Sequence, residues 1–221
     1  MRLYSYYRSS ASYRVRVALA LKRIDYEYIP VDISNQMRAQ ATDAFEAINP
    51  MGQVPVLEWA GEGGEIRRLA QSSAIVEYLE EIRPEPPLLP QSAWARAKIR
   101  EAVQIVNAGI QPLQNLHTLN VLRAAAGPTL EARFRDESIA RGLVALERAA
   151  CEHEGPFFFG VSPSIADVFI IPQLYNARRF GVAVGEGRLK EIEQEAANHA
   201  AFKAAHPDQQ PDAPQAEARS P

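Results

Sequence analysis

The sequence predicts an α/β domain of order βαβαββα over residues 1–83, a linker at 84–91 and an all-α domain over 92–221. Three observations carry this prediction. Strand and helix patterns alternate as far as residue 83. The linker then holds four prolines within residues 84–90, and such a run cannot form a helix. From residue 92 onward the apolar residues recur with helical spacing.

Alternation, helical spacing and turn residues predict the elements of the first domain. The first four are a strand at 2–7, a helix running from the serines at 9–12 through Leu19, a strand at 24–31 and a helix at 37–48. They are followed by a hairpin of strands 56–59 and 66–70 around a glycine-rich turn. A helix opened by Gln71-Ser72-Ser73 completes the domain.

The second domain is predicted from apolar residues at helical spacing. A long helix over 92–126 is interrupted at 109–112, where a glycine and a proline predict a kink. A second helical pattern covers 129–154. Ser164 and Asp167 form a capping box that opens an apolar helix over Val168–Tyr175. A last helix is predicted over 189–205, and the polar, proline-containing tail from His206 is predicted to be irregular.

Composition narrows the classes of function. The net charge of −3 gives no general attraction to nucleic acid or to acidic membranes. No apolar run is long enough to span a bilayer. The single cysteine, Cys151, excludes an intramolecular disulfide, and we interpret it as an inert, small apolar residue. His, Cys, Asp and Glu lack metal-ligand spacing, so no metal site is expected. These points favour a cytoplasmic, two-part soluble protein in a reducing environment.

The turn at Ser9–Ser12 is the first candidate site. It joins the first strand to a helix, and any of its serines could cap the first turn of that helix. Free backbone N–H groups and the positive end of the helix dipole make such a turn suitable for an anion. The simpler alternative is a serine-capped helix in an ordinary α/β domain.

Motifs throughout the chain resemble those of the zeta-class glutathione transferases, the maleylacetoacetate isomerases. Ser9–Arg16 resembles the class signature Ser-Ser-Cys-x-Trp-Arg-Val-Arg, with Ala11 at the place of the usual cysteine. The other matching stretches are 49–55, Gln71-Ser72, 109–116, 176–180 and the ending at 206–212, whereas 183–188 departs from the family pattern. The resemblance implies a thioredoxin-like first domain, the glutathione transferase fold and a homodimer.

The resemblance also implies the site residues. Ser9, with Ser10 beside it, is expected to hydrogen-bond the sulfur of glutathione. Glutathione is the implied cofactor, and its peptide is expected to pair with the backbone of Val54 ahead of a cis Pro55. The full set expected to bind glutathione is Ser9, Ser10, Ala11, Ser12, Tyr13, Arg14, Gln40, Val54, Pro55, Gln71, Ser72, Gln111, Asn115, Leu116 and His117. Gln111 is a candidate for reaching the partner subunit's glutathione.

Two arginines are expected to bind the carboxylates of the substrate. Arg8 precedes the signature and Arg179 lies in the last third of the chain, and the planar fork of arginine suits a carboxylate. Arg178 is expected to be solvated. The implied reaction is reversible addition of the glutathione thiolate to the cis double bond of maleylacetoacetate, with release of the trans product.

Three alternatives remain open from the sequence. The first is the same chemistry on maleylpyruvate. The second is a general glutathione transferase or dehalogenase. The third is a non-catalytic thioredoxin-like interaction module, against which the retention of Ser9, Gln71, Ser72 and both arginines argues.

Overall fold

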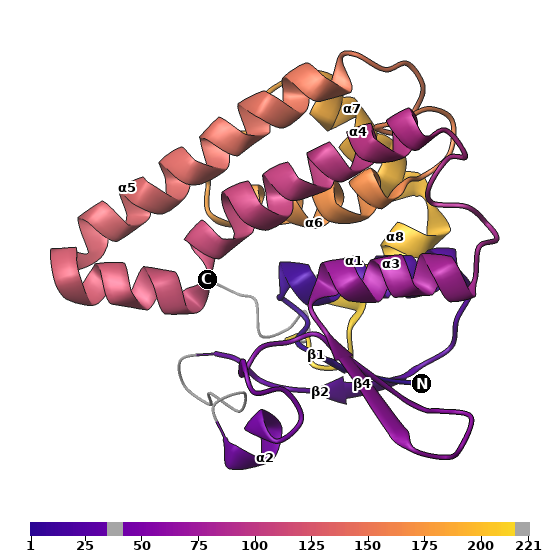
Figure 1. Cartoon of the computed structure of the whole chain (residues 1–221). Coiled ribbons are helices and arrows are strands. Elements are labelled where there is room, and N and C mark those ends of the chain that lie inside the picture. The colour runs from indigo at the N-terminus through magenta and orange to yellow at the C-terminus, as the bar shows by residue number, and fades with distance from the viewer. Residues whose placement is uncertain (35–41, 215–221) are drawn as a thin grey trace. The chain divides into compact units, whose positions relative to one another are not determined.

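The chain forms two compact units in the computed structural model, which describes residues 1–34 and 42–214 (Figure 1). The first unit contains Met1–Pro86 and His199–Pro221, and the second contains Pro87–Asn198. The C-terminal segment therefore differs from the prediction, which had placed everything after residue 92 in the helical domain. The physical reason is that α8 (Ala200–Ala205) packs on α1 (Ser10–Leu21) of the first unit.

The first unit is built on a mixed four-stranded sheet of order β2-β1-β3-β4. Strand β1 (Arg2–Ser5) pairs parallel to β2 (Glu27–Pro30) and antiparallel to β3 (Val56–Ala60). Strand β4 (Ile66–Ala70) completes a hairpin with β3. With α1, α2 (Asp43–Glu46) and α3 (Ser72–Ile82), the chain order is βαβαββα, as predicted.

The two faces of the sheet follow from the alternation of side chains along β1 and β3. Tyr4 is paired with Val56, and the Tyr4 ring contacts Phe45 of α2 with ring centroids 6.2 Å apart. Leu3 is paired with Leu57, and both are fully buried on the opposite face. Figure 1 shows α1 and α3 together on one side of the sheet and α2 on the other.

The first part of the predicted linker belongs to the first unit. The ammonium of Lys22, which is buried at the C-terminus of α1, forms an ion pair with Glu80. It also donates to the carbonyl of Pro86 at 2.7 Å. Lys22 thereby holds the chain where it leaves α3, and Pro87 begins the second unit.

The second unit contains four α-helices among the described residues, with breaks between and within them. Helix α4 (Ala93–Gln104) continues into a π-helical turn at Ile105–Ile110 and a 3-10 turn at Gln111–Gln114. The predicted kink therefore occurs as a local change of helix type. Helix α5 (Leu116–Ala150) breaks at Gly127, whose φ of 82° is the left-handed conformation that favours glycine.

Helix α6 (Ile165–Arg179) forms the core of the second unit. Every residue from Ile165 to Leu174 is buried. The predicted capping box is present, because the Asp167 carboxylate accepts from the backbone N–H and the hydroxyl of Ser164, both at 2.8 Å. The helix begins earlier and ends later than the predicted Val168–Tyr175.

The last predicted helix, 189–205, is divided in two. Helix α7 (Arg188–Asn198) is the last element of the second unit. His199 then caps α8, because its Nδ1 accepts from the Ala201 amide at 3.2 Å. None of the helices described in either unit has the length and apolar character needed to cross a membrane.

Candidate active site

Ser9 lies at the N-cap of α1, the position predicted for the sulfur-binding hydroxyl. Its extended backbone ends the turn after β1, and its Oγ accepts a hydrogen bond from the Ser12 amide at 3.2 Å. Accepting this bond leaves the Ser9 hydroxyl proton available for donation. The side chain is half-buried. Ser9 can therefore donate to an anion at the positive end of the α1 dipole.

Most of the residues that follow Ser9 are buried. Ala11 is half-buried, whereas Ser10, Ser12, Tyr13 and Arg14 are buried. The Ser12 side chain is completely inaccessible, and its amide is bonded to Ser9. The Ser12 and Tyr13 side chains are buried, and the assignment of these two residues to glutathione stays a prediction.

Arg14 connects α1 to the beginning of α3. Its Nη1 donates to the Ser72 Oγ at 3.1 Å. Burial lowers the pKa of Arg14 to about 9, so the guanidinium remains charged at neutral pH. The second turn of α1 and the first turn of α3 consequently lie against each other.

Gln71 occupies the N-cap position of α3 in a strained conformation. Its φ is +70°, a backbone conformation that residues other than glycine seldom adopt. Its own side chain makes no capping hydrogen bond, and the residue is exposed. Ser72 is the first helical residue. Strain of this kind concentrates at binding sites, where the surrounding structure maintains it.

The Val54–Pro55 bond is cis, as the family resemblance implied. Both residues are buried directly before β3, and Val54 packs in a cluster with Tyr6, Phe45 and Val56. A second cis bond joins Glu85 to Pro86. Gln40, the remaining glutathione candidate of the first unit, lies outside the described residues.

These features give the first unit two helix N-termini with complementary properties. Ser9 offers a hydroxyl donor at α1, and Gln71 and Ser72 stand at the first turn of α3. Each helix N-terminus favours a negative group. Glutathione carries one such group at its sulfur, when ionised, and others at its carboxylates, so the residues present fit this cofactor.

Arg8 lies between the first strand and Ser9. Its guanidinium carbon is 6.0 Å from the ring centroids of both Tyr6 and Tyr7, and the side chain is half-buried. Two aromatic rings therefore hold the arginine one residue before the hydroxyl of Ser9. This is a suitable place for a cation that binds a substrate carboxylate.

The candidates from the second unit gather around the start of α5. Asn115 caps this helix, because its Oδ1 accepts from the His117 amide at 3.1 Å. Leu116 and His117 are exposed, and Gln111 is partly exposed in the preceding 3-10 turn. The neighbouring Gln114 is buried in an amide pair with Gln173, a structural contact.

Arg178 and Arg179 end α6 in different environments. Arg178 forms an ion pair with Glu193, with Nε 2.8 Å from Oε1, so it is paired and not simply solvated as predicted. Arg179 is exposed, and its guanidinium lies 4.2 Å from the centroid of Phe180. The exposed Arg179 guanidinium is a candidate for binding a carboxylate ligand.

Cys151 is exposed. Desolvation and the nearby Glu147 carboxylate raise the pKa of its thiol. A raised pKa disfavours the reactive thiolate, which agrees with an inert role. Within residues 1–34 and 42–214, no group of three or more His, Cys, Asp or Glu could hold a metal ion.

The sequence did not indicate that Asp212 contacts the segment before Ser9. Asp212 accepts hydrogen bonds from the Tyr7 amide and the Tyr28 hydroxyl, and it lies in the tail that was predicted to be irregular. A residue pair separated by 205 positions leaves no local pattern. The only available signal was the resemblance of the ending at 206–212 to the family.

Comparison with known proteins agrees with this architecture. Residues 3–87 match the family model for the glutathione S-transferase N-terminal domain. Maleylacetoacetate isomerase of Pseudomonas aeruginosa is 42% identical over 218 residues, covering 98% of this chain and 100% of that protein. The sheet order, the cis proline and the helical second unit thus define the class of glutathione transferases.

Two solved structures extend the comparison. The crystal structure of maleylacetoacetate isomerase from Anaeromyxobacter dehalogenans, with glutathione bound in its active site, has a TM-score of 0.87 and 49% identity, and covers 96% of this chain and 97% of that one. The holo structure of a bacterial zeta-class maleylpyruvate isomerase has a TM-score of 0.90 and 35% identity, covering 97% and 100%. The chain belongs to the maleylacetoacetate isomerase family, the zeta class of the glutathione transferases.

Proposed function

We propose that the protein is a glutathione-dependent cis–trans isomerase that converts maleylacetoacetate to fumarylacetoacetate. The observation that carries the proposal is the placement of Ser9. This residue lies at the N-cap of α1, and its hydroxyl proton is free to donate. In the same unit, the Arg14–Ser72 bond holds the first turn of α3 against α1. The glutathione bound to the Anaeromyxobacter dehalogenans relative supports the assignment of glutathione as the cofactor.

The cofactor supplies a thiol whose sulfur adds to a double bond conjugated to a ketone and leaves again after rotation about the former double bond. The protein must favour the ionised form of that thiol. The Ser9 hydroxyl donates toward the sulfur, and the α1 dipole adds a favourable potential. Ser10 is the nearest substitute donor. No metal has a role in this scheme.

Gln71 and Ser72 are assigned to the γ-glutamyl carboxylate of the cofactor. The exposed Gln71 side chain and the N–H groups at the start of α3 supply donors for this anion. The backbone of Val54 is assigned to the peptide of glutathione. Gln111, Asn115, Leu116 and His117 are assigned to further cofactor contacts from the second unit.

Arg8 and Arg179 are assigned to the two carboxylates of the substrate. Each places a guanidinium beside aromatic rings, at 6.0 Å from two centroids and 4.2 Å from one. A maleyl acid with a carboxylate at each end needs two such cations. This pairing of cations distinguishes an isomerase of dicarboxylates from a general transferase.

The substrate assignment is tested by assaying maleylacetoacetate and maleylpyruvate side by side, with and without glutathione. The proposal predicts glutathione-dependent isomerisation, with the higher kcat/KM for maleylacetoacetate. A higher kcat/KM for maleylpyruvate would assign the chain to the smaller acid, the activity named for the zeta-class structure above. Turnover of neither acid would overturn the proposal.

We further propose a cytoplasmic homodimer that acts in tyrosine and phenylalanine breakdown. The family resemblance at Gln111 supports the dimer, because it implies a contact with the partner subunit's glutathione. Such a contact makes glutathione binding depend on assembly. Sedimentation measurements over a range of protein concentrations, combined with glutathione titration, test this dependence.

A further inference from the structure

The carboxylate of Asp212 joins the C-terminal segment to the turn before Ser9. Its Oδ2 accepts from the backbone N–H of Tyr7 at 3.0 Å, and its Oδ1 accepts from the Tyr28 hydroxyl at 2.7 Å. Burial raises the pKa of Tyr28, so this hydroxyl keeps its proton and remains a donor at neutral pH. Both carboxylate oxygens of Asp212 are therefore engaged within the first unit.

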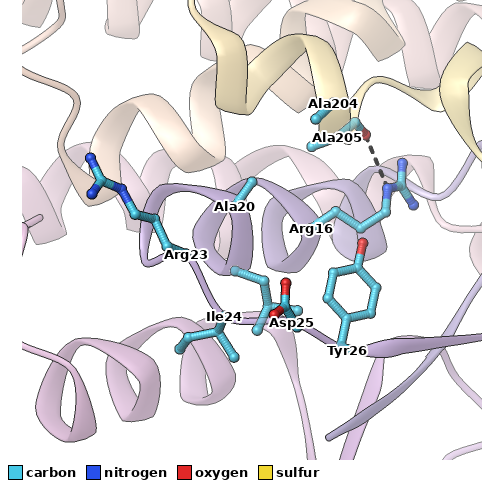
Figure 2. A pocket seen from close by; sticks show the side chains of 9 residues that line it. Arg16, Ala20, Arg23, Ile24, Asp25, Tyr26, Ala204 and Ala205 are labelled. Carbon is cyan, nitrogen blue, oxygen red and sulfur yellow. Dashed lines mark hydrogen bonds between the residues drawn. The ribbon is translucent and has the colours of Figure 1, made fainter.

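Arg16 makes a second connection between the same two segments. Its Nε donates to the Ala205 carbonyl of α8 at 3.0 Å, the bond drawn in Figure 2. Its Nη2 donates to the Tyr7 carbonyl at 2.9 Å, and Nη1 bonds the Tyr6 carbonyl at 3.3 Å. Both backbone polar groups of Tyr7 are thus fixed, the N–H by Asp212 and the carbonyl by Arg16.

Figure 2 also shows the pocket beside Arg16, which has a volume of about 330 Å³ and is bordered by α1, residues 23–26 and α8. Arg16 lines it but is completely buried and holds Ser5, Tyr6, Tyr7 and Ala205. We therefore infer that Arg16 connects α8 to the segment before Ser9, and we assign no ligand to the pocket.

The C-terminal segment is itself ordered around Asp212. The buried Gln210 side chain donates to the carbonyls of Ala204 and His206 at 3.0 and 2.9 Å. The His206 ring meets the Tyr13 ring edge-on, with centroids 6.0 Å apart. These contacts hold the turn that carries Asp212 against α1, in addition to the bond between Asp212 and Tyr7.

We propose that Asp212 is a positioning residue for the turn that carries Arg8 and Ser9. The assignment of a role to that turn rests on the proposed function. The connection is short, because Tyr7 is directly followed by Arg8 and Ser9, and the Ser9 amide donates to the Tyr6 carbonyl at 3.0 Å. Without Asp212 the peptide between Tyr6 and Tyr7 loses the hydrogen bond on its N–H side and keeps those that Arg16 and the Ser9 amide make to its carbonyl. The peptide can then tilt about that carbonyl, and the Ser9 hydroxyl moves with it. Small displacements of this kind strongly reduce catalysis even when every reacting group is retained.

Hydrogen exchange measured at single amides tests the positioning without any substrate. In Asp212→Ala, the amides of Ser9 and Ser12 should exchange roughly 10-fold faster or more, although neither amide bonds Asp212 itself. Asp208→Ala removes the same charge from an exposed position in the same segment and should leave both amides unchanged. Wild-type exchange at Ser9 and Ser12 in Asp212→Ala would overturn the proposal.

Asp212→Asn tests whether Asp212 acts through its hydrogen bonds or through its negative charge. Its amide oxygen can still accept from the Tyr7 N–H, and its NH₂ group can donate to the Tyr28 oxygen. We expect near wild-type exchange and kcat in this variant, against a kcat reduced roughly 10- to 100-fold with little change in KM in Asp212→Ala. Equal losses in both variants would assign the effect to charge and overturn positioning by hydrogen bonds.

The exchange measurement also separates this proposal from the proposed function. If the wild-type protein isomerises neither maleyl acid, the proposed function fails, while exchange at Ser9 and Ser12 still decides the role of Asp212. Tyr28→Phe removes one donor to Asp212 and serves if Asp212→Ala does not fold. It should produce a smaller acceleration at the same two amides, and an unchanged rate there would count against the proposal.

Discussion

Arg14 Nη1 donates to Ser72 Oγ at 3.1 Å, and this bond joins the second turn of α1 to the first turn of α3. Both residues are buried. A hydrogen bond from a charged donor in such a place is stronger than one between neutral groups. It keeps together the two helix N-termini to which we assign the sulfur and the γ-glutamyl carboxylate of glutathione.

Ser72→Ala removes the acceptor of Arg14 and a donor at the start of α3. We expect the free energy of unfolding to fall by about 1.5–3 kcal/mol, since a bond to a charged group is lost. The dissociation constant of glutathione should rise in the same variant. Denaturant unfolding and calorimetric titration measure the two effects. Ser73→Ala, at the next and less buried position, is the control and should change neither value appreciably.

Ser9→Ala should raise the pKa of the bound glutathione thiol. Loss of a hydrogen bond to a charged group costs roughly 1.5–3 kcal/mol, which corresponds to about one to two pKa units. The thiolate absorbance of the bound cofactor, titrated against pH, measures this shift. Ser9→Thr keeps both the hydroxyl and the helix cap and should behave as wild type. An unshifted pKa in both Ser9→Ala and Ser10→Ala would mean that backbone amides alone activate the sulfur.

Replacing Arg8 or Arg179 with Ala should lower kcat/KM for maleylacetoacetate and leave glutathione affinity nearly constant. Each substitution removes a charge-assisted bond worth roughly 1.5–3 kcal/mol, so the expected loss is about 10- to 150-fold. Arg178→Ala is the matched control, because it breaks only the surface ion pair with Glu193, worth at most about 1 kcal/mol. Loss of glutathione binding in the Arg8 and Arg179 variants, with unchanged substrate preference, would reverse the assignment.

Tyr28 should make the protein less stable in alkali. Burial raises its pKa above the value of about 10 that it has in the unfolded chain. A raised pKa in the folded state contributes stability that is complete below pH 10 and is lost as the pH rises toward the folded pKa. Tyr28→Phe should remove a slope of up to about 1.4 kcal/mol per pH unit above pH 10. Denaturant unfolding of both proteins at several pH values tests this, and parallel curves would contradict it.

The sequence predicted those parts of the fold that depend on local patterns. The βαβαββα order, the Ser164–Asp167 capping box and the break near Gly109–Pro112 arise from alternation, helical spacing and residues with a restricted backbone. The cis Val54–Pro55 bond came from the family resemblance alone, because no local pattern distinguishes it from a trans bond.

The long-range contacts were not predictable in the same way. The Tyr7–Asp212 and Arg16–Ala205 bonds each connect residues about 200 positions apart, and both form because α8 packs on α1. The strain at Gln71 and the burial of Ser12 and Tyr13 also depend on the packed structure. The sequence therefore predicted the family and its cofactor, while the contacts that Tyr7 makes with Asp212 and Arg16 came from the structure.

Glutathione turnover tests the central claim most directly. Isomerisation of maleylacetoacetate is followed together with the free-thiol concentration, with glutathione present at far below the substrate concentration. A catalytic cofactor that leaves after each cycle predicts complete isomerisation with an unchanged thiol concentration, and no isomerisation when glutathione is omitted. Loss of one thiol for each molecule of substrate consumed would contradict the account, since it would identify a conjugating transferase instead of an isomerase.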